Sequence, residues 1–287
     1  MSEETPDQAP DSAESRLHRP LPDWPFFLGL GILAAFYILL IAAMLLADVF
    51  YAAKEWRSVG AILVSEEIRY ATWLSLISCS ITTILSLWVA IPIGYLMSRW
   101  EFRGKALIDA ILDIPIFLPP LVIGLSLLIL FRQTPLKHLD DYFSIALSIP
   151  AVIIAQFSVA SAFAVRTLRA TFDEITPRRE QVAMTLGCSR NQAFWFVVIP
   201  EAKRGILTAA TLAWARALGE FGPILVFAGS TRKRTEVLPV SVHLELSIGN
   251  IEGAVGVSLL MVAIALTVLV LVRVLGGAER ANRGFAP

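Results

Sequence analysis

The sequence is poor in the residues that build metal sites and disulfide frameworks. It has two cysteines, Cys79 and Cys188, and three histidines that are scattered along the chain. With no Cys/His cluster, neither a metal site nor a disulfide framework is expected. The formal net charge is zero, so the overall charge gives no reason to expect a nucleic-acid partner.

Charged residues are also missing from long stretches of the chain. Only 17% of the residues are charged, whereas 56% are hydrophobic, and the windows 26–47, 70–98 and 142–165 contain no Asp, Glu, Lys or Arg. About 20 apolar residues in a helix span the hydrocarbon core of a bilayer, at roughly 1.5 Å per residue. The sequence therefore predicts an all-α, multi-pass membrane protein surrounded by lipid.

Six transmembrane helices are expected, at 26–47, 69–98, 106–131, 142–166, 204–229 and 253–274. The third should be kinked or broken, because it contains Pro115, Pro119 and Pro120. If the N-terminus is cytoplasmic, the cytoplasmic segments carry 15 Lys and Arg and the outer loops carry 8. This bias predicts that both termini are cytoplasmic.

The chain reads as one transmembrane domain with two tails. Residues 26–275 form the expected membrane domain, including a long cytoplasmic loop at 171–200, and residues 276–287 form a cytoplasmic tail. Residues 1–25 are acidic and contain prolines, without the basic start and small-residue cleavage site of a signal peptide. We expect them to be a disordered cytoplasmic tail.

Sequence motifs of nucleotide hydrolysis and of hydrolytic enzymes are absent. Gly104-Lys105 lacks the earlier glycine and the hydroxyl residue of a phosphate-binding loop, and there is no Gly-x-Ser-x-Gly or His-Glu-x-x-His. Asp109 and Asp113 could suggest an intramembrane aspartyl site, but two such acids normally lie on different helices. We therefore expect no enzyme and no bound cofactor on this chain; a membrane-embedded enzyme and a purely structural scaffold are the weaker alternatives.

The cytoplasmic loop contains signals for two short helices. Thr176-Pro177 is typical of a helix start, and Gly187 can take the left-handed conformation that ends a helix. Ser189 and Gln192 can form a capping box for a second helix, which should end near Pro200. Three interpretations are an amphipathic loop on the membrane surface, a DNA-binding helix-turn-helix and a docking element for a cytosolic partner. Two flanking spans argue against the DNA-binding interpretation.

The fifth span contains a charged pair at membrane depth. Arg216 and Glu220 are four residues apart, so they face the same way and can pair. A charge there costs roughly 2.5–3.5 kcal/mol, which leaves two interpretations, an ion pair that locks helices together and an element of a pathway or gate. Gly219 and Gly222-Pro223 should weaken the helix nearby. The candidate pathway residues are Arg216, Glu220, Gly222 and Ser161, and further polar residues of spans two and four could line a path or pack helices.

Residues 180–200 resemble the signature loop of permease subunits of bacterial ATP-binding-cassette importers. The pattern Glu-Ala-Ala, three residues, Gly, nine residues and Ile-x-Leu-Pro falls on Gln181-Val182-Ala183, Gly187 and Val197 to Pro200, and Glu180 lies one residue earlier. The resemblance implies that the loop seats on a separate cytosolic ATPase dimer, which binds the ATP. The coupling residues it implies are Glu180, Gln181, Ala183, Gly187 and Pro200.

Other stretches look like permeases for molybdate, tungstate and sulfate, namely 113–120, 165–170 and 216–222. This resemblance implies import of a tetrahedral oxyanion across the inner membrane, with molybdate or tungstate first and sulfate or another substrate as the alternative. It also implies an extracytoplasmic oxyanion-binding protein and a second, identical permease chain. The outer triplet Arg232-Lys233-Arg234 could attract the anion, dock the binding protein or simply be a solvated loop.

Overall fold

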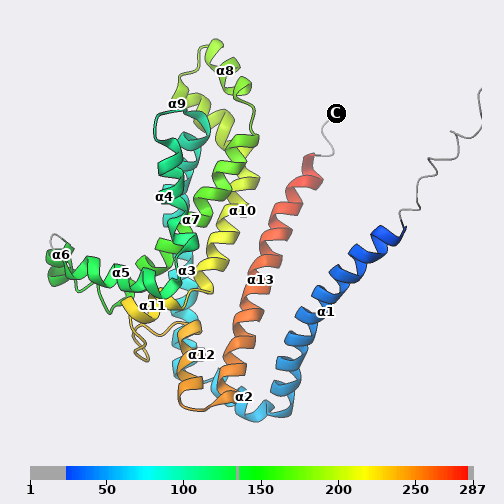
Figure 1. Ribbon diagram of the computed structural model, residues 1–287, viewed down its shortest axis with the longest axis vertical. Coiled ribbons are helices and arrows are strands. Elements are labelled where there is room, and N and C mark those ends of the chain that lie inside the picture. The colour runs from blue at the N-terminus through cyan, green and yellow to red at the C-terminus, as the bar shows by residue number, and fades with distance from the viewer. Residues whose placement is uncertain (1–23, 134–135, 284–287) are drawn as a thin grey trace, which may run out of the picture. The chain divides into compact units, whose positions relative to one another are not determined.

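The computed structural model describes residues 24–133 and 136–283, and the chain separates into two units, 1–50 and 51–287. All regular elements in the described residues are helical, as predicted (Figure 1). The tail expected at 1–25 lies outside the described residues up to residue 23. The last four residues of the tail expected at 276–287 lie outside them as well.

Helix α1 (Trp24–Lys54) covers the described residues of the first unit and matches the first predicted span. Its apolar side chains are exposed nearly all around the helix, including Phe26, Leu33 and Leu40. It is long and apolar enough to cross a membrane. A helix that is apolar on every side is stable in lipid or against other membrane helices.

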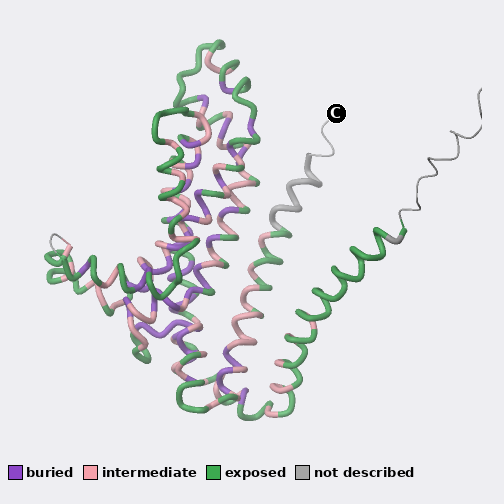
Figure 2. Tube along the Cα trace, viewed as in Figure 1, coloured by how far each residue is buried: buried purple, intermediate pink, exposed green. Residues whose placement is uncertain are grey.

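The core of the second unit is a bundle of α3 (Glu66–Arg99), α7 (Ile149–Glu174) and α10 (Ile199–Leu218). Fully buried alanines line the contacts, and the buried residues concentrate along these helices (Figure 2). A Cβ on Gly94 would lie 3.1 Å from the Leu168 Cβ, and one on Gly205 would collide with the Thr171 side chain. Small residues therefore bring the helices close together, as is typical of membrane bundles.

Two of the predicted spans are broken helices. The third consists of α4 (Lys105–Phe117) and α5 (Pro120–Arg132), with a bend of 110° between them. The fifth consists of α10 and α11 (Gly222–Phe227), separated by residues 219–221. The breaks fall at the prolines of span three and at the glycines of span five, so both predicted weak points are confirmed.

The unit also contains α2 (Trp56–Leu63), α6 (Leu136–Phe143), α12 (Leu238–Ser247) and α13 (Ile251–Arg283). Helix α13 packs against α12, α2 and α10. Figure 1 shows α12 and α2 at one end of the unit and α8 (Pro177–Thr185) at the opposite end. The cytoplasmic loop predicted at 171–200 therefore lies at the end away from α12.

The start predicted for span four is wrong. The expected span was 142–166, but α6 ends at Phe143 and α7 runs from Ile149 to Glu174. Between them the backbone turns at Ser144 and Leu147, which have positive φ values of 48° and 58°. Ile145, Ala146 and Leu147 of the turn are apolar, so hydropathy does not detect the break. Pro150 in the first turn favours a helix start.

The structure supports fewer complete spans than the six predicted. Four described helices are long and apolar enough to cross a membrane, and the bent pair α4 and α5 raises the number to five. Helix α10 is not among them, because it carries Glu201, Lys203, Arg204 and Arg216 and ends at Leu218.

Candidate coupling loop and transport pathway

Helix α8 and the turn after it have the geometry that the sequence predicts. The helix begins at Pro177, although the Thr176 side chain makes no capping hydrogen bond. Gly187 has a φ of 96°, and its amide donates to the Met184 carbonyl. The Cys188 amide donates to the Ala183 carbonyl at 3.1 Å. These two bonds form a Schellman motif, which ends a helix at a left-handed residue.

The second helix of the loop continues past its predicted end. Ser189 and Gln192 form the expected capping box at the start of α9 (Arg190–Ala193). A π-helical turn, η2 (Phe194–Val198), follows and leads directly into α10. The expected end near Pro200 is therefore wrong. Proline lacks an amide donor, but it is tolerated in the first turn of a helix. Pro200 lies in the first turn of α10, directly after the wider π turn.

The carboxylate of Glu180 faces the body of the protein. It accepts a 2.5 Å hydrogen bond from the Tyr95 hydroxyl and lies 3.5 Å from the Arg99 Nε. Arg99 also donates to the carbonyls of Phe172 and Ile175 at 2.9 Å, at the end of α7. Glu180 is buried as a result. This contact ties α8 to α3 and α7.

The other side of α8 is exposed. Of the predicted coupling residues, Gln181, Gly187 and Pro200 are exposed, and Ala183 is half-buried. Val182 and Leu186 present apolar side chains that are 56% and 80% exposed. Exposed apolar residues at the tip of a polar loop are typical of a protein-docking surface.

The structure adds residues that sequence reasoning missed. Tyr95 and Arg99 lie near the end of span two, and Arg179 of α8 forms an ion pair with Glu201 of α10. No sequence motif marks Tyr95 or Arg99, because their partner is about 80 residues away. Their role depends on the tertiary contact between α3 and α8.

Arg216 and Glu220 form the predicted ion pair. The Arg216 Nη1 lies 2.6 Å from the Glu220 Oε2, and the two side chains are 29% and 1% exposed. The Arg216 guanidinium also lies over the Phe163 ring of α7, 5.6 Å from its centroid. Arg216 belongs to helix α10, whereas Glu220 lies in the break between α10 and α11.

A cavity of about 300 Å³ adjoins this pair where the two broken helices meet. A Cβ on Gly222 would lie 2.8 Å from the Pro120 Cβ, and one on Gly124 would lie 2.8 Å from the Pro223 Cα. Glycine therefore allows α5 and α11 to approach at the two breaks. The cavity is lined by Pro119, Pro120, Leu121, Arg216, Gly219, Glu220, Phe221 and Gly222.

The hydroxyl residues predicted as alternatives mostly pack helices. Thr82 donates to the Gln156 Oε1, and the Gln156 amide donates to the Ala217 carbonyl, both at 3.2 Å. The Ser75 hydroxyl accepts from the Leu238 amide at 2.9 Å. Ser161 is half-buried on α7 and does not line the cavity beside Arg216. Of the four pathway candidates, the structure brings together Arg216, Glu220 and Gly222.

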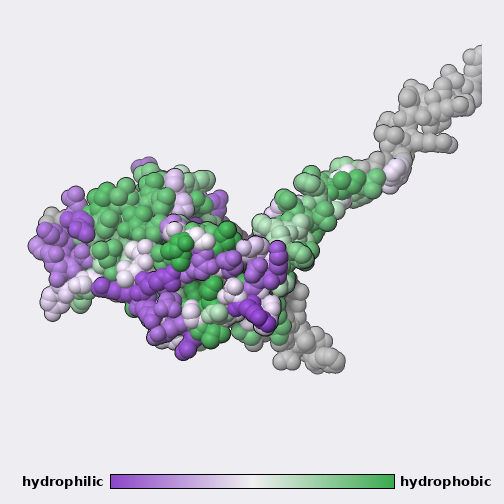
Figure 3. Space-filling view, turned by 90° about the horizontal axis from the view of Figure 1, so that it is seen from below, coloured by the Kyte–Doolittle hydropathy of each residue, from purple (hydrophilic) through white to green (hydrophobic). Residues whose placement is uncertain are grey.

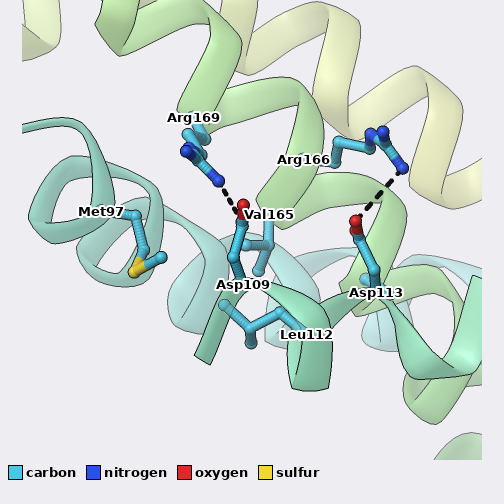
Figure 4. Close-up of a pocket in the computed structure, with 8 residues that line it drawn as sticks. Met97, Asp109, Leu112, Asp113, Val165, Arg166 and Arg169 are labelled. Carbon is cyan, nitrogen blue, oxygen red and sulfur yellow. Dashed lines mark hydrogen bonds and ion pairs between the residues drawn. The ribbon is translucent and has the colours of Figure 1, made fainter. Parts of the chain in front are cut away.

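Asp109 and Asp113 pair with arginines of α7 (Figure 4). Asp109 contacts Arg169, and the Asp113 Oδ2 lies 3.5 Å from the Arg166 Nη1, beside a cavity of about 70 Å³. Each acid has a cation as its partner, so the two do not form a carboxyl pair that shares a proton. Within the described residues, no group of three or more potential metal ligands occurs.

The basic triplet Arg232-Lys233-Arg234 is largely engaged with carboxylates. The Arg232 Nη2 lies 2.8 Å from Glu245, and the Lys233 Nζ lies 2.7 Å from Glu66. These hydrogen bonds raise the pKa of Arg232 and of Lys233 above their ordinary values. Figure 3 shows this end of the second unit, where hydrophilic side chains form a band beside hydrophobic surface. The triplet is thus tied to α3 and α12.

The chain is a helical membrane bundle with two broken helices and a polar loop anchored through Glu180. This architecture fits a multi-pass transport component. Residues 90–278 match the family described as binding-protein-dependent transport system inner membrane component. The chain belongs to this family, whose members are transport subunits rather than enzymes.

Relatives of this chain are named for molybdenum, for molybdate/tungstate and for sulfate. The chain is 33% identical to a probable molybdenum ABC transporter permease of Haloferax volcanii, over 86% of this chain and 87% of that protein. It is 31% identical to the molybdate/tungstate permease WtpB of Pyrococcus furiosus, over 88% and 95%. It is 30% identical to the sulfate permease CysW of a Synechocystis strain, over 85% and 90%.

The fold also matches a solved transporter. A chain of a bacterial alginate ABC transporter in complex with an alginate-bound periplasmic protein superposes with a TM-score of 0.72 at 13% identity. The match covers 88% of this chain and 93% of that chain. At this identity the similarity concerns the fold.

Proposed function

We propose that this chain is the permease subunit of an ATP-driven importer for a tetrahedral oxyanion, molybdate or tungstate. The loop at 177–200 docks on a separate cytosolic ATPase dimer, which binds and hydrolyses the ATP. An extracytoplasmic binding protein delivers the anion, and a second, identical permease chain completes the pathway. Both termini are cytoplasmic, with six spans in which the third and the fifth are broken.

The observation that carries the coupling role is the anchoring of α8. Glu180 fixes the inner side of the helix to Tyr95 and Arg99, while Val182 and Leu186 are exposed on the outer side. A rigidly held helix with an apolar tip can transmit a movement of a docked partner to the rest of the chain, whereas a flexible loop cannot. The continuous helix from α9 into α10 supplies the route into the membrane domain.

An exposed charge supports a second permease chain. Arg166 is 62% exposed on α7, which is a candidate membrane span. Arg166 is the last residue of the predicted fourth span, near its cytoplasmic end, where a charged side chain is more stable against protein or water than against lipid. A second copy placed against this face would enclose a hydrated path between the two chains, which is where an anion could pass.

The proposed substrate class rests on the charge of the anion and on the names of the relatives. Relatives of the chain are named for molybdenum, molybdate/tungstate and sulfate. A doubly charged oxyanion needs a cation along its path, and Arg216 lines the cavity between the broken helices. Sulfate is the second candidate substrate, because it has the same charge and tetrahedral shape and a relative is named for it.

The test is uptake of labelled molybdate into vesicles that contain this chain, its ATPase and its binding protein. We expect ATP-dependent uptake that unlabelled tungstate blocks and sulfate does not. Equal competition by sulfate would move the assignment to a sulfate importer. An assembled complex that takes up none of the three anions would overturn the oxyanion assignment and leave family membership intact.

A further inference from the structure

The ion pair of Arg216 and Glu220 lines a cavity, and this placement has a consequence for the route of the substrate. We propose that Arg216 is a transient binding site for a tetrahedral dianion, and that Glu220 is an internal competitor that takes the place of the anion when the site is empty. This inference rests on the proposed oxyanion import.

The Arg216 side chain has hydrogen-bonding capacity that Glu220 does not use. A guanidinium has five N–H donors in a planar fork, and it suits oxyanions better than a lysine does. The nearest contact to Glu220 is through Nη1 at 2.6 Å. The side chain is 29% exposed and borders a cavity of about 300 Å³, so an anion can reach the remaining donors.

Glu220 explains why such a site would bind weakly. A carboxylate and a tetrahedral oxyanion accept the same hydrogen bonds, so they compete for the same guanidinium. Glu220 is almost fully buried. An anion that displaces it leaves a buried carboxylate without its partner, which is strongly unfavourable. The carboxylate therefore drives the anion off again, and a site in a transport path must release its substrate.

Arg216 and Glu220 belong to different structural elements. Arg216 is part of the regular helix α10, whereas Glu220 follows Gly219 in the break before α11. Helix α11 is held against α5 by the close contacts at Gly222 and Gly124. A movement of α10 relative to this packed junction would therefore change the distance between the cation and its competitor.

A second arginine, Arg166 of α7, lies near Phe163 on the side of the predicted cytoplasmic loop. The Phe163 ring beneath Arg216 also lines a cavity of about 410 Å³ that includes Arg166 and Thr167, both on α7. Arg166 forms a 3.5 Å ion pair with Asp113. An anion that leaves Arg216 would therefore meet another weakly paired guanidinium one helical turn beyond Phe163.

The test measures binding of labelled molybdate and labelled sulfate to the purified permease–ATPase complex by equilibrium dialysis, without the binding protein. Glu220→Gln removes the competitor, so we expect at least about tenfold tighter binding than in the wild type. The double variant Arg216→Gln/Glu220→Gln should bind neither anion. It removes both charges together and leaves no unpaired buried charge, so it should still assemble with the ATPase.

The matched control is Arg132→Gln, which removes an exposed arginine at the end of α5 and should leave binding and uptake unchanged. Uptake into vesicles then separates a transit site from a structural ion pair. A purely structural pair predicts that the double variant transports normally once it assembles. A transit site predicts a loss of uptake of at least about tenfold in the double variant.

Two binding results would overturn the inference. One is Glu220→Gln with no gain in binding of either anion, and the other is a gain that persists when Arg216 is also replaced. Failure of the proposed function looks different, because there the wild-type complex itself imports neither anion from its binding protein. A wild type that transports, together with a double variant that transports equally well, rejects the site and keeps the function.

Discussion

The Tyr95 hydroxyl on α3 donates a 2.5 Å hydrogen bond to the Glu180 carboxylate on α8. This contact joins a transmembrane helix to the loop that is proposed to meet the ATPase. If Glu180 contacted the ATPase directly, its carboxylate would point outward. Its inward position makes it a positioning residue for α8.

Loss of this anchor should destabilise the loop. Tyr95→Phe removes one hydrogen bond and should cost about 1 kcal/mol, whereas Glu180→Ala should cost more, because it also leaves Arg99 without a carboxylate. Thermal unfolding and hydrogen exchange of residues 177–187 measure the effect. Gln181→Ala is the control, since that neighbouring side chain is exposed and should change stability by less than about 0.5 kcal/mol. Equal effects of the two alanine variants would contradict the anchoring role.

Gly187→Val should disrupt coupling through the backbone alone. A Cβ at Gly187 would meet no atom within 4 Å, but the φ of 96° is unfavourable for a β-branched residue, at a cost of roughly 1–2 kcal/mol. We expect reduced copurification with the ATPase and reduced uptake, with Gly187→Asn close to wild type because asparagine tolerates this conformation.

Gly104→Val is the matched control for backbone strain. Gly104 has a φ of 92° and also has no atom within 4 Å of an added Cβ, but it lies at the start of α4. The two valine variants should lose similar stability, and only Gly187→Val should lose the ATPase. Retention of normal transport by Gly187→Val would refute the coupling role of the turn.

Gly124→Ala should destabilise the junction of the broken helices. The added Cβ would lie 2.8 Å from the Pro223 Cα, which is backbone and cannot move aside as a flexible side chain would. Overpacking of this kind costs typically 1–3 kcal/mol. Thermal unfolding of the purified chain measures this loss of stability. Gly60→Ala in α2 is the control, because an added Cβ there meets nothing within 4 Å, and it should be neutral or slightly stabilising.

The stability of the segment before α12 should depend on pH through Glu236. Burial raises the pKa of this carboxyl above its ordinary value, against the lowering effects of the Ser241 hydrogen bond and the Arg232 charge. The folded state therefore binds more protons than the unfolded state between the ordinary and the raised pKa. Stability should fall as pH rises through this window. Glu236→Gln should flatten that slope in thermal unfolding; an unchanged slope would contradict the assignment.

Much of the coupling loop could be predicted from local sequence. Gly187 and the pair Ser189 and Gln192 act on neighbouring residues only, so their turn and capping box follow from the identity of the side chains. The spacing of Arg216 and Glu220 likewise predicted that they pair, and they do so although Glu220 lies just beyond the end of α10. These features do not depend on the rest of the fold.

Other features depend on contacts that no local pattern records. The turn at Ser144 to Leu147 lies in an apolar stretch, so hydropathy merged it with span four. The inward direction of Glu180 depends on where α3 ends, and the partners of Asp109 and Asp113 on α7 depend on how α4 packs. Pro200 seemed to end a helix, because the π turn that accommodates it has no recognised sequence signal.

The uninterrupted run from α9 through η2 to α10 makes the docking loop and the anion cavity two ends of one rod. Helix α10 alone has 20 residues, from Ile199 to Leu218. A helix of that length is about 30 Å long, so a tilt of about 6° at one end displaces the other by about 3 Å. That is about the length of a hydrogen bond. A small rocking movement at the ATPase would therefore be enough to make or break the contact between Arg216 and Glu220, with no need to unfold or slide any helix.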